Sequence, residues 1–504
     1  AVTEAAKTEA ETTAAAQTEA GGEKNLVMPS ASCVANLNPL LEGYKEAAML
    51  NPIYDPLYVI DVNETRYYLA DSYEVSEDGM QITVKLKEDL KWHDGEAITA
   101  DDMIFTMDVC SDTNNGAGGT NIVILNDQPV KYEKVDDLTV KVTLPMASAS
   151  YADLLGGLTL IPEHVFEGNP SVVSAGEANM KGIGSGPYKV TEFKQDEYLL
   201  LEKYEDYYMG APSIDKVTFR IISDLSAQEV ALMNGEVNFM ELANAPAVAK
   251  YEADPNFTVV KYPEGRVNYL AVNKFCETVQ DPKVVEAVFA ALNRDEIIAG
   301  AYGDGMAESA NSIFSNVNTF YDPSVEGYTQ DVEKAKQLVK ETGLDSKTLT
   351  LYFNSERVYM KESAQIIQQQ LKNVGINLEV IPLESAGFFE KVFGTDGDYE
   401  FYLNGYGAVG DPDQVVAGMY DGTWGVNLAV SDEVSQLWKD ARTVYTPEER
   451  AAIYKQIQIQ TRDELTCYPI AYPNYVFVTT SNIKGADTIK RTPVFEDYTK
   501  LTME

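Results

Sequence analysis

Residues 69–108 read LADSYEVSEDGMQITVKLKEDLKWHDGEAITADDMIFTMD, and this stretch decides how the chain around it folds. Apolar and polar residues alternate over 82–87, which is the two-residue period of a strand with one buried face. A loop over 92–95 follows, and Thr99 with Asp102 forms the pattern of a capping box at the start of a helix. The stretch therefore predicts a strand, a loop and a capped helix, in that order.

The same patterns recur along the chain. Alternation over 134–144 predicts a second strand with one apolar face. Asp281 is a natural N-cap before a proline, and it predicts a helix start. Further on, residues 349–353 predict a strand, 363–373 an amphipathic helix and 376–381 another strand. A strand, helix and strand of these lengths form a parallel βαβ unit by default, so the chain is expected to be of the α/β class.

Length and charge restrict the function classes. A chain of 504 residues is too long for one core, so two or three domains are expected. The formal net charge of −40 would repel nucleic acid and anionic membrane surfaces, and it argues against both as partners. No apolar run approaches the roughly 18–20 residues that a spanning helix needs. These numbers favour an acidic multidomain protein but do not identify its ligand.

The cysteines give no sign of a redox or metal site. None of them belongs to a CxxC pair, and single cysteines are most often small buried apolar residues. Disulfides remain possible, but the sequence does not say which cysteines would pair. The four residues are Cys33, Cys110, Cys276 and Cys467.

Three other motifs favour structural roles over chemistry. His93 precedes an aspartate, but His164 is the only other histidine, so a metal phosphohydrolase site is not supported. The acidic cluster at 396–400 lacks the spacing and central glycine of an EF-hand, which favours a solvated loop. The glycines of 182–188 precede a strand and not a helix, so they predict a tight crossing between lobes and not a phosphate site. With 79 acidic residues, chance carboxylate pairs are expected, and a glycosidase pair cannot be recognised from sequence.

Many short motifs, read together and in order, resemble the peptide-type (family 5) extracellular solute-binding proteins of ABC transporters. The opening stretch is similar to that family's "ALAESWEVSDDG", "KFHDG" and "TADDV" segments, and GIGSGPY at 182–188 is similar to its "GTGPY". The resembling segments lie at 36–40, 51–58, 69–79, 91–95, 99–103, 182–188, 199–212, 231–237 and 281–295. The resemblance runs from about residue 25 to near the C-terminus.

The resemblance implies a two-lobed, periplasmic-binding-protein-like α/β fold (type II, cluster C) with an extra small α/β lobe in its first domain. Residues 1–23 lack large apolar side chains and are expected to be a disordered tether. The remaining boundaries that the resemblance implies are a discontinuous first domain (24–50, 180–265 and 470–504), an inserted lobe (50–180) and a second domain (265–470).

The implied function is that of an extracellular solute-binding component, which closes on a peptide-like ligand and delivers it to an ABC permease. An oligosaccharide or a chelated metal would fit the same fold, and an extracellular hydrolase is the alternative from another class. No catalytic residue, metal ligand or cofactor is expected, nor is a nucleic-acid partner, and the protein is expected to be a monomer. The chain reads as a mature form whose targeting segment has been removed, held at the outer face of the cell membrane by a lipid anchor as in Gram-positive bacteria, or free in the periplasm of a Gram-negative one.

The candidate ligand contacts centre on the segment YLNGYGAVGDPD at 402–413, which resembles the family's ligand-facing loop. Glycines there let a ligand approach the backbone closely, and aromatic residues supply rigid contact surface. Peptide binders of the family place an aspartate near this motif against the peptide's amino group, where this chain has Ala408; Asp411 is the possible substitute. The predicted ligand-binding residues are Tyr406, Gly407, Ala408, Asp411, Asp413, Trp424, Tyr269 and Asn38.

Overall fold

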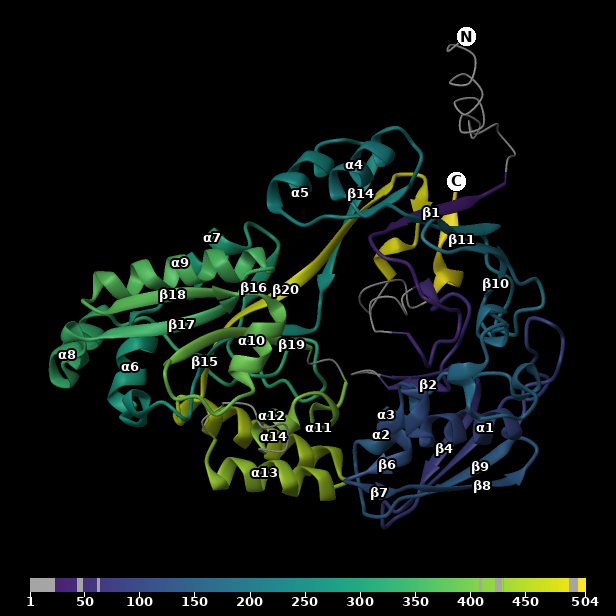
Figure 1. Ribbon diagram of the computed structural model, residues 1–504, viewed down its shortest axis with the longest axis horizontal. Helices are drawn as coiled ribbons and strands as arrows, with labels where there is room; N and C mark the ends of the chain where they lie inside the picture. Colours follow the sequence, from purple (N-terminus) through teal and green to yellow (C-terminus); the bar gives the residue numbers. More distant parts are fainter. Residues whose placement is uncertain are drawn as a thin grey trace, which may run out of the picture.

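A computed structural model describes residues 23–42, 49–60, 64–407, 410–421, 428, 430–488 and 497–504. Figure 1 shows a second domain on the left joined at the top to a first domain, with the inserted lobe below the first domain on the right. Separate clusters of buried apolar residues occupy these three parts, and the exact domain boundaries stay a prediction.

The inserted lobe contains residues 69–108, and the strand and the capped helix predicted within that stretch are confirmed. The strand over 82–87 is β5 (Gln81–Leu86), and Thr99 caps α1 (Ala100–Ser111) in a reciprocal capping box with Asp102. The single strand predicted over 134–144 is wrong. Asp136 accepts a hydrogen bond from the backbone N–H of Leu138, and this turn divides the segment into two antiparallel strands. The other elements of the lobe are β2 (Tyr58–Ile60), β3 (Thr65–Tyr67), β4 (Ala70–Val75), α2 (Thr120–Val123), β6 (Ile124–Leu125), β7 (Gln128–Pro129), β8 (Lys131–Asp136), β9 (Thr139–Thr143) and α3 (Tyr151–Gly156).

The first domain is assembled from segments that are far apart in sequence. Its four-stranded sheet has the order β1-β12-β11-β10, and β1 pairs in parallel with β12 although nearly 200 residues separate them. Its elements are β1 (Asn25–Ser30), β10 (Tyr188–Lys194), β11 (Tyr198–Lys203), β12 (Lys216–Ile221), α4 (Leu225–Met233), β13 (Phe239–Glu241), α5 (Ala245–Glu252), β14 (Phe257–Pro263), β21 (Ile483–Lys484) and β22 (Thr502–Met503).

The second domain has a sheet with apolar cores on both faces. The predicted βαβ unit is confirmed. The strands β17 (Thr348–Asn354) and β18 (Asn377–Leu383) pair in parallel with each other, and α9 (Val358–Asn373) connects them in sequence. The other elements are β15 (Arg266–Val272), α6 (Pro282–Ala291), α7 (Arg294–Ala301), β16 (Ala307–Ser309), α8 (Val332–Thr342), α10 (Ser385–Val392), β19 (Phe401–Gly407), α11 (Pro412–Val415), α12 (Ala417–Tyr420), α13 (Asp432–Thr443) and α14 (Pro447–Asp463).

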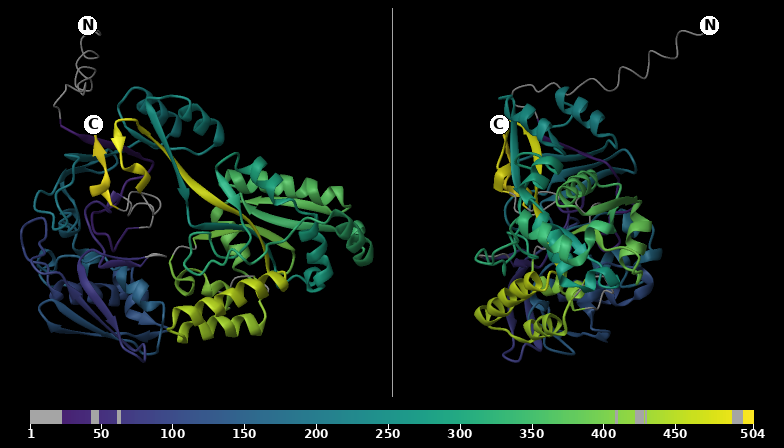
Figure 2. Two further views of the ribbon diagram at one scale, coloured as in Figure 1. Left: turned by 180° about the vertical axis from the view of Figure 1, so that it is seen from behind. Right: turned by 90° about the vertical axis from the view of Figure 1, so that its left-hand side faces the viewer.

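One long strand belongs to both domains. The first residues of β20 (Cys467–Thr480) pair with β15 in the second domain, and its later residues pair with β14 and β13 in the first. The other chain crossing, from β14 to β15, turns at Gly265, which has a φ of 72°. Figure 2 shows β20 as the yellow strand that runs from one domain to the other. We call these two crossings, at residues 263–266 and 473–474, the hinge.

The inserted lobe and the first domain meet at a tightly packed joint. His93 Nε2 donates to the carbonyl oxygen of Gly186 at 2.9 Å, and the backbone N–H of Gly184 donates to His93 Nδ1 at 3.1 Å. A Cβ atom on Gly184 would lie 1.9 Å from the carbonyl oxygen of Ile53, so only glycine fits there. Burial lowers the pKa of His93 to about 4, which keeps the ring neutral and able to serve as donor and acceptor at once. The predicted structural role of His93 and the tight crossing at 182–188 are both confirmed.

A buried carboxylate lies at the same joint. Asp55 is 4% exposed, and its Oδ2 accepts hydrogen bonds of 2.8 Å from the hydroxyl groups of Tyr207 and Tyr208. The backbone N–H of Asp55 also donates to Ser185 Oγ at 3.0 Å. Burial raises the pKa of Asp55 to about 7, in spite of the lowering effect of the two hydroxyl groups. The joint therefore holds a group that titrates near neutral pH.

We expect Asp55→Asn to stabilise the protein most above pH 7. Because the folded pKa of Asp55 lies above the unfolded value, the native carboxyl group contributes stability at low pH that is lost as pH rises toward about 7. Asparagine resembles the protonated acid, so the difference in melting temperature between variant and parent should grow from pH 5 to 7 and then level off. Asp206→Asn, at an exposed position nearby, is the control for replacing an acid by an amide. A constant difference for Asp55→Asn would contradict the raised pKa.

Candidate ligand-binding site

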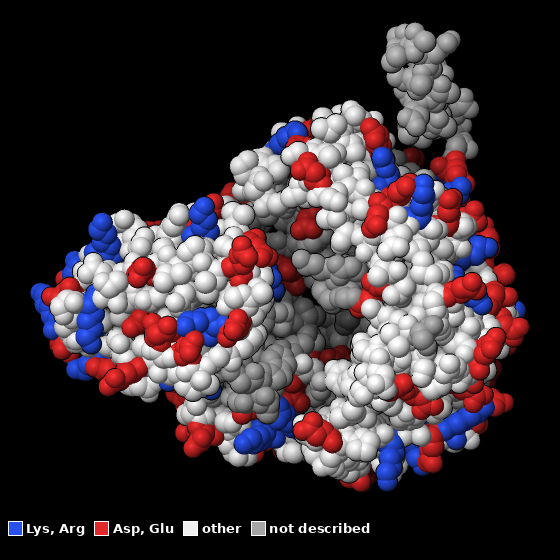
Figure 3. Space-filling view, viewed as in Figure 1, with Lys and Arg blue, Asp and Glu red and all other residues white. Residues whose placement is uncertain are grey.

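The face shown in Figure 3 has a hollow at its centre, between the second domain on the left and the first domain and inserted lobe on the right. Strand β19 runs toward this hollow in the matching view of Figure 1 and carries the predicted ligand-facing segment at its end. The predicted site residues differ in their exposure and in their partners.

Gly405 and Gly407, at the end of β19, differ in whether the surrounding structure requires a glycine. A Cβ atom on Gly405 would lie 2.0 Å from Asn268 Oδ1 and 2.9 Å from Arg266 Nε, so packing inside the domain excludes a side chain there. Gly407, which pairs with Arg266 across the ladder, is exposed. Its chain neighbours aside, no atom of the described residues lies within 4 Å of its missing Cβ. Its φ is not positive, so backbone conformation does not require glycine either. Gly407 thus leaves an open, flat stretch of backbone at the end of the strand.

The tyrosines predicted as contacts lie inside the second domain. Tyr406 is 9% exposed, and its hydroxyl donates to the carbonyl oxygen of Ile313 at 2.6 Å. Tyr269 is 1% exposed, with its ring centroid 5.2 Å from that of Tyr406. Burial raises the pKa of both phenols well above the usual value. Both rings pack in the apolar cluster that also contains Trp438 and Tyr420.

Asp411 is held by a buried arginine. Arg450 donates from Nη1 to Asp411 Oδ2 at 2.5 Å and from Nη2 to Asp411 Oδ1 at 3.0 Å, which is a bidentate pair. Arg450 is 5% exposed, and its Nε donates to the carbonyl oxygen of Ala441. Tyr454 donates its hydroxyl to the same carboxylate at 3.3 Å. Both oxygens of Asp411 are therefore engaged inside the domain, and a ligand ammonium group would have to compete with a guanidinium group.

Asp413 is shared between the second domain and the inserted lobe. Arg442 Nε donates to Asp413 Oδ1 at 2.5 Å, and Ser150 Oγ donates to Asp413 Oδ2 at 2.9 Å. Its side chain is 6% exposed, and burial raises its pKa against the lowering effect of Arg442. The motif at 410–413 thus connects two parts of the molecule.

The remaining predicted residues lie elsewhere or outside the description. Asn38 is 2% exposed; its Nδ2 donates to Asn179 Oδ1 at 3.0 Å, and its Oδ1 accepts from the backbone N–H of Leu40. These contacts place Asn38 in a buried turn that faces the inserted lobe, and not beside β19. Ala408 and Trp424 lie outside the described residues.

Two arginines and a serine hold the 410–413 motif, and none of the three was predicted from the sequence. Arg450 and Tyr454 are one helical turn apart on α14, and Gln458, also buried, continues the same face. This stripe of buried polar residues is a signal that sequence can carry. Arg442 and Ser150 give no such signal, because their roles depend on contacts far away in sequence.

Three further properties of the described residues concern metal ions, membrane crossing and disulfide bonds. It contains no group of three or more histidine, cysteine or acidic residues placed to hold a metal ion. Among these residues, no helix has the length and apolarity to cross a membrane. All four cysteines are free, and Cys110, Cys276 and Cys467 are buried as predicted.

We expect Arg450→Met to lower the free energy of unfolding by about 3–5 kcal/mol, because it leaves the buried Asp411 carboxylate without its cation. Lys455→Met, on the same helix, breaks an ion pair with Asp322 whose side chains are 44% and 27% exposed. That control should cost no more than about 1 kcal/mol. Urea unfolding followed by circular dichroism measures both, and equal losses would show that the Asp411–Arg450 pair is not important for stability.

Known proteins match most of this chain. The family model "Bacterial extracellular solute-binding proteins, family 5 Middle" matches residues 64–427. The dipeptide-binding protein of Escherichia coli (strain K12) is 27% identical over 499 residues, which cover 92% of this chain and 92% of that protein.

Solved structures match over nearly the whole chain. The ABC transporter substrate-binding protein CtaP of Listeria monocytogenes has a TM-score of 0.89 at 32% identity, covering 95% of this chain and 99% of that one. The oligopeptide-binding protein AppA of Bacillus subtilis, in complex with a nonapeptide, has a TM-score of 0.73 at 26% identity, covering 96% and 99%. The two-lobed α/β fold expected from the sequence is therefore confirmed, and this chain belongs to the bacterial extracellular solute-binding proteins of family 5.

Proposed function

We propose that this protein captures peptides between its two domains and hands them to an ABC permease at the outer face of the cell membrane. The observation that carries the proposal is Gly407, an exposed glycine that neither packing nor backbone conformation requires. A bare strand end beside a hollow suits main-chain hydrogen bonds to an extended peptide, which give affinity with little sequence preference. The names of the E. coli and B. subtilis relatives, which refer to dipeptides and oligopeptides, support the same ligand class.

The predicted site residues take different parts in this proposal. Gly407, with Ala408 and Trp424, contacts the peptide directly. Tyr406 and Tyr269 support the strand from the core, while Asp411 and Asp413 hold the following loop through Arg450 and Arg442. Asn38 fixes the turn after β1 in the first domain. Because Asp411 already binds a guanidinium group, we infer that the peptide is held mainly by its backbone and not by a free amino group.

We propose further that the protein is a monomer that binds without turning its ligand over. The alternatives are an oligosaccharide or a chelated metal as ligand, and hydrolysis in place of transport. We propose that a lipid anchor holds the protein at the cell surface, as in Gram-positive bacteria; in a Gram-negative cell it would instead lie in the periplasm.

Two experiments test the proposal. Native mass spectrometry of the freshly purified protein detects a co-purified ligand. Equilibrium dialysis then measures retention from an equimolar pool of synthetic di- to nonapeptides and from a pool of oligosaccharides. Retention of intact peptides supports it. Retention of sugars alone would change the ligand class, and cleaved peptides would identify a hydrolase.

We expect Trp424→Ala to weaken peptide retention by roughly 5- to 150-fold, since a stacked, desolvated aromatic contributes on the order of 1–3 kcal/mol. Its melting temperature should change little. The matched control is Trp438→Ala, because Trp438 is fully buried in the second-domain core. That change should cost about 3–5 kcal/mol of stability. Unchanged retention in Trp424→Ala would place the site elsewhere on the fold.

A further inference from the structure

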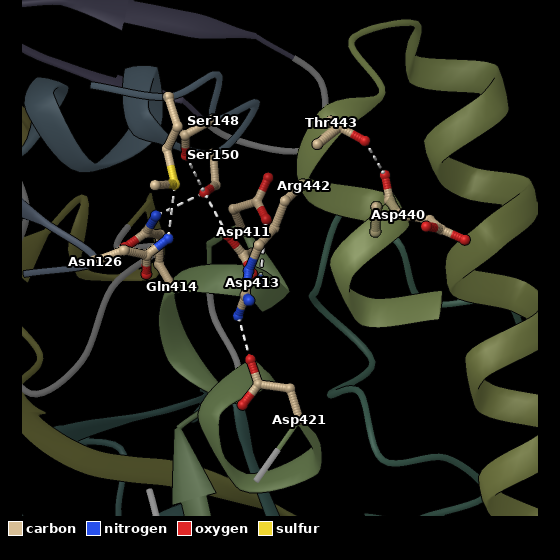
Figure 4. A network of polar contacts seen from close by, with 12 residues as sticks. Asn126, Ser148, Ser150, Asp411, Asp413, Gln414, Asp421, Asp440, Arg442 and Thr443 are labelled. Atoms are coloured by element: carbon tan, nitrogen blue, oxygen red, sulfur yellow. Dashed lines mark hydrogen bonds and ion pairs between the residues drawn. The ribbon is translucent and has the colours of Figure 1, made fainter. Parts of the chain in front are cut away.

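The inserted lobe and the second domain meet at a polar contact, drawn in Figure 4, that the ligand proposal does not use. Ser150 Oγ donates to Asp413 Oδ2 at 2.9 Å, and Gln414 Nε2 donates to Ser150 Oγ at 2.6 Å. The backbone N–H of Asp411 donates to Asp153 Oδ2 at 3.0 Å. We call these five residues the latch. Ser150 is fully buried and Asp411 is 8% exposed, so this is a closed contact and not a surface encounter.

On the second-domain side of the latch, Arg442 holds the carboxylate of Asp413 in place. In Figure 4, Arg442 lies between two carboxylates, and it donates to Asp413 Oδ1 and to Asp421 Oδ2 at 2.5 Å each. The carbonyl oxygen of Arg442 also accepts the backbone N–H of Ala149, from the lobe, at 3.0 Å. Because the guanidinium group occupies one oxygen of Asp413, the other oxygen is presented to Ser150.

A second contact fits around the same interface. Gly79 has a φ of 65°, and a Cβ atom there would lie 2.0 Å from Cζ of Tyr445 in the second domain. The lobe thus receives this ring only because position 79 lacks a side chain. Both contacts join the same two parts of the molecule.

The latch lies across the hollow from the hinge. In Figure 1, β14 and β20 connect the domains above the hollow, in the upper half of the view, and α13 meets the lobe at the bottom. The hollow of Figure 3 lies between these two ends. The joint around His93 and Asp55 binds the lobe to the first domain, so rotation about the hinge must separate Ser150 from Asp413.

We propose that the latch holds the closed form of the protein and thereby sets its ligand affinity, with Ser150 and Asp413 as positioning residues that do not touch the ligand. The inference rests on the proposed function for the opening motion. Hydrogen bonds across the interface can be replaced by bonds to water when the domains part, so a polar contact opens more readily than an apolar one. A ligand that binds only the closed form gains affinity in proportion to the fraction already closed.

The test uses the full chain with Ser150→Ala and Asp413→Asn, alone and together. X-ray scattering of the protein without added peptide should give a larger radius of gyration for each variant than for the parent. Equilibrium dialysis against the pool of di- to nonapeptides should show retention weakened about 3- to 10-fold. Because both changes break the same Ser150–Asp413 hydrogen bond, the losses of retention in the two single variants should not add fully in the double variant.

Thr443→Ala is the matched control, because Thr443 donates to Asp440 within the end of α13 and does not reach the lobe. It should match the parent in both measurements. Equal radii for Ser150→Ala, Thr443→Ala and the parent, with and without peptides, would overturn the latch, as would fully additive losses of retention. If the circular dichroism of Asp413→Asn shows that this variant does not fold, the measurements on Ser150→Ala alone test the latch. A parent that retains no peptide would defeat the proposed function, while the radius measured without peptide would still test the latch.

Discussion

The two domains depend on one shared strand. Residues 467–471 of β20 pair with β15, and residues 474–480 pair with β14, so a continuous backbone runs through both sheets. Backbone groups in a ladder are costly to leave unpaired, so the strand resists breaking between these two sets of partners. The pairing partner changes near Pro473 and Gly265, so we infer that any relative motion of the domains centres there.

Local sequence signals predicted the elements well and their long-range partners poorly. Thr99 and Asp102 identified a helix start, and alternation identified β5, because both depend on neighbours a few residues away. The prediction of one strand over 134–144 was wrong, because Asp136 forms a turn there. The apolar residues on both sides of Asp136 continued the alternating pattern and gave no sign of the turn. Most of the fold, though, came from the family resemblance, since no local pattern predicts that β1 pairs with β12.

The site shows the same division more sharply. A glycine-rich segment with flanking aromatic residues predicted a ligand-facing loop at 402–413. The sequence does not show which of its side chains point outward. Alternation along β19 places Tyr406 in the core and exposes Gly407, one residue away. The aspartates of the motif read as ligand contacts because their partners, Arg442 and Arg450, lie about 30 and 40 residues further along the chain. In a protein with 79 acidic and only 39 basic side chains, the choice of partner for a given carboxylate is a tertiary property.

The energetics of closure connect these observations. Four hydrogen bonds cross between lobe and second domain through Ser150, Asp153 and the backbone of Ala149. Each contributes about 1 kcal/mol net, because water replaces it on opening, so together they amount to a few kcal/mol. That is enough to shift a balanced equilibrium strongly toward the closed form, yet small enough for the domains to open on their own. Under these conditions a peptide need not supply all of the closure energy through its side chains. Contacts made with its backbone alone can suffice, which is what a binding protein of broad sequence tolerance requires.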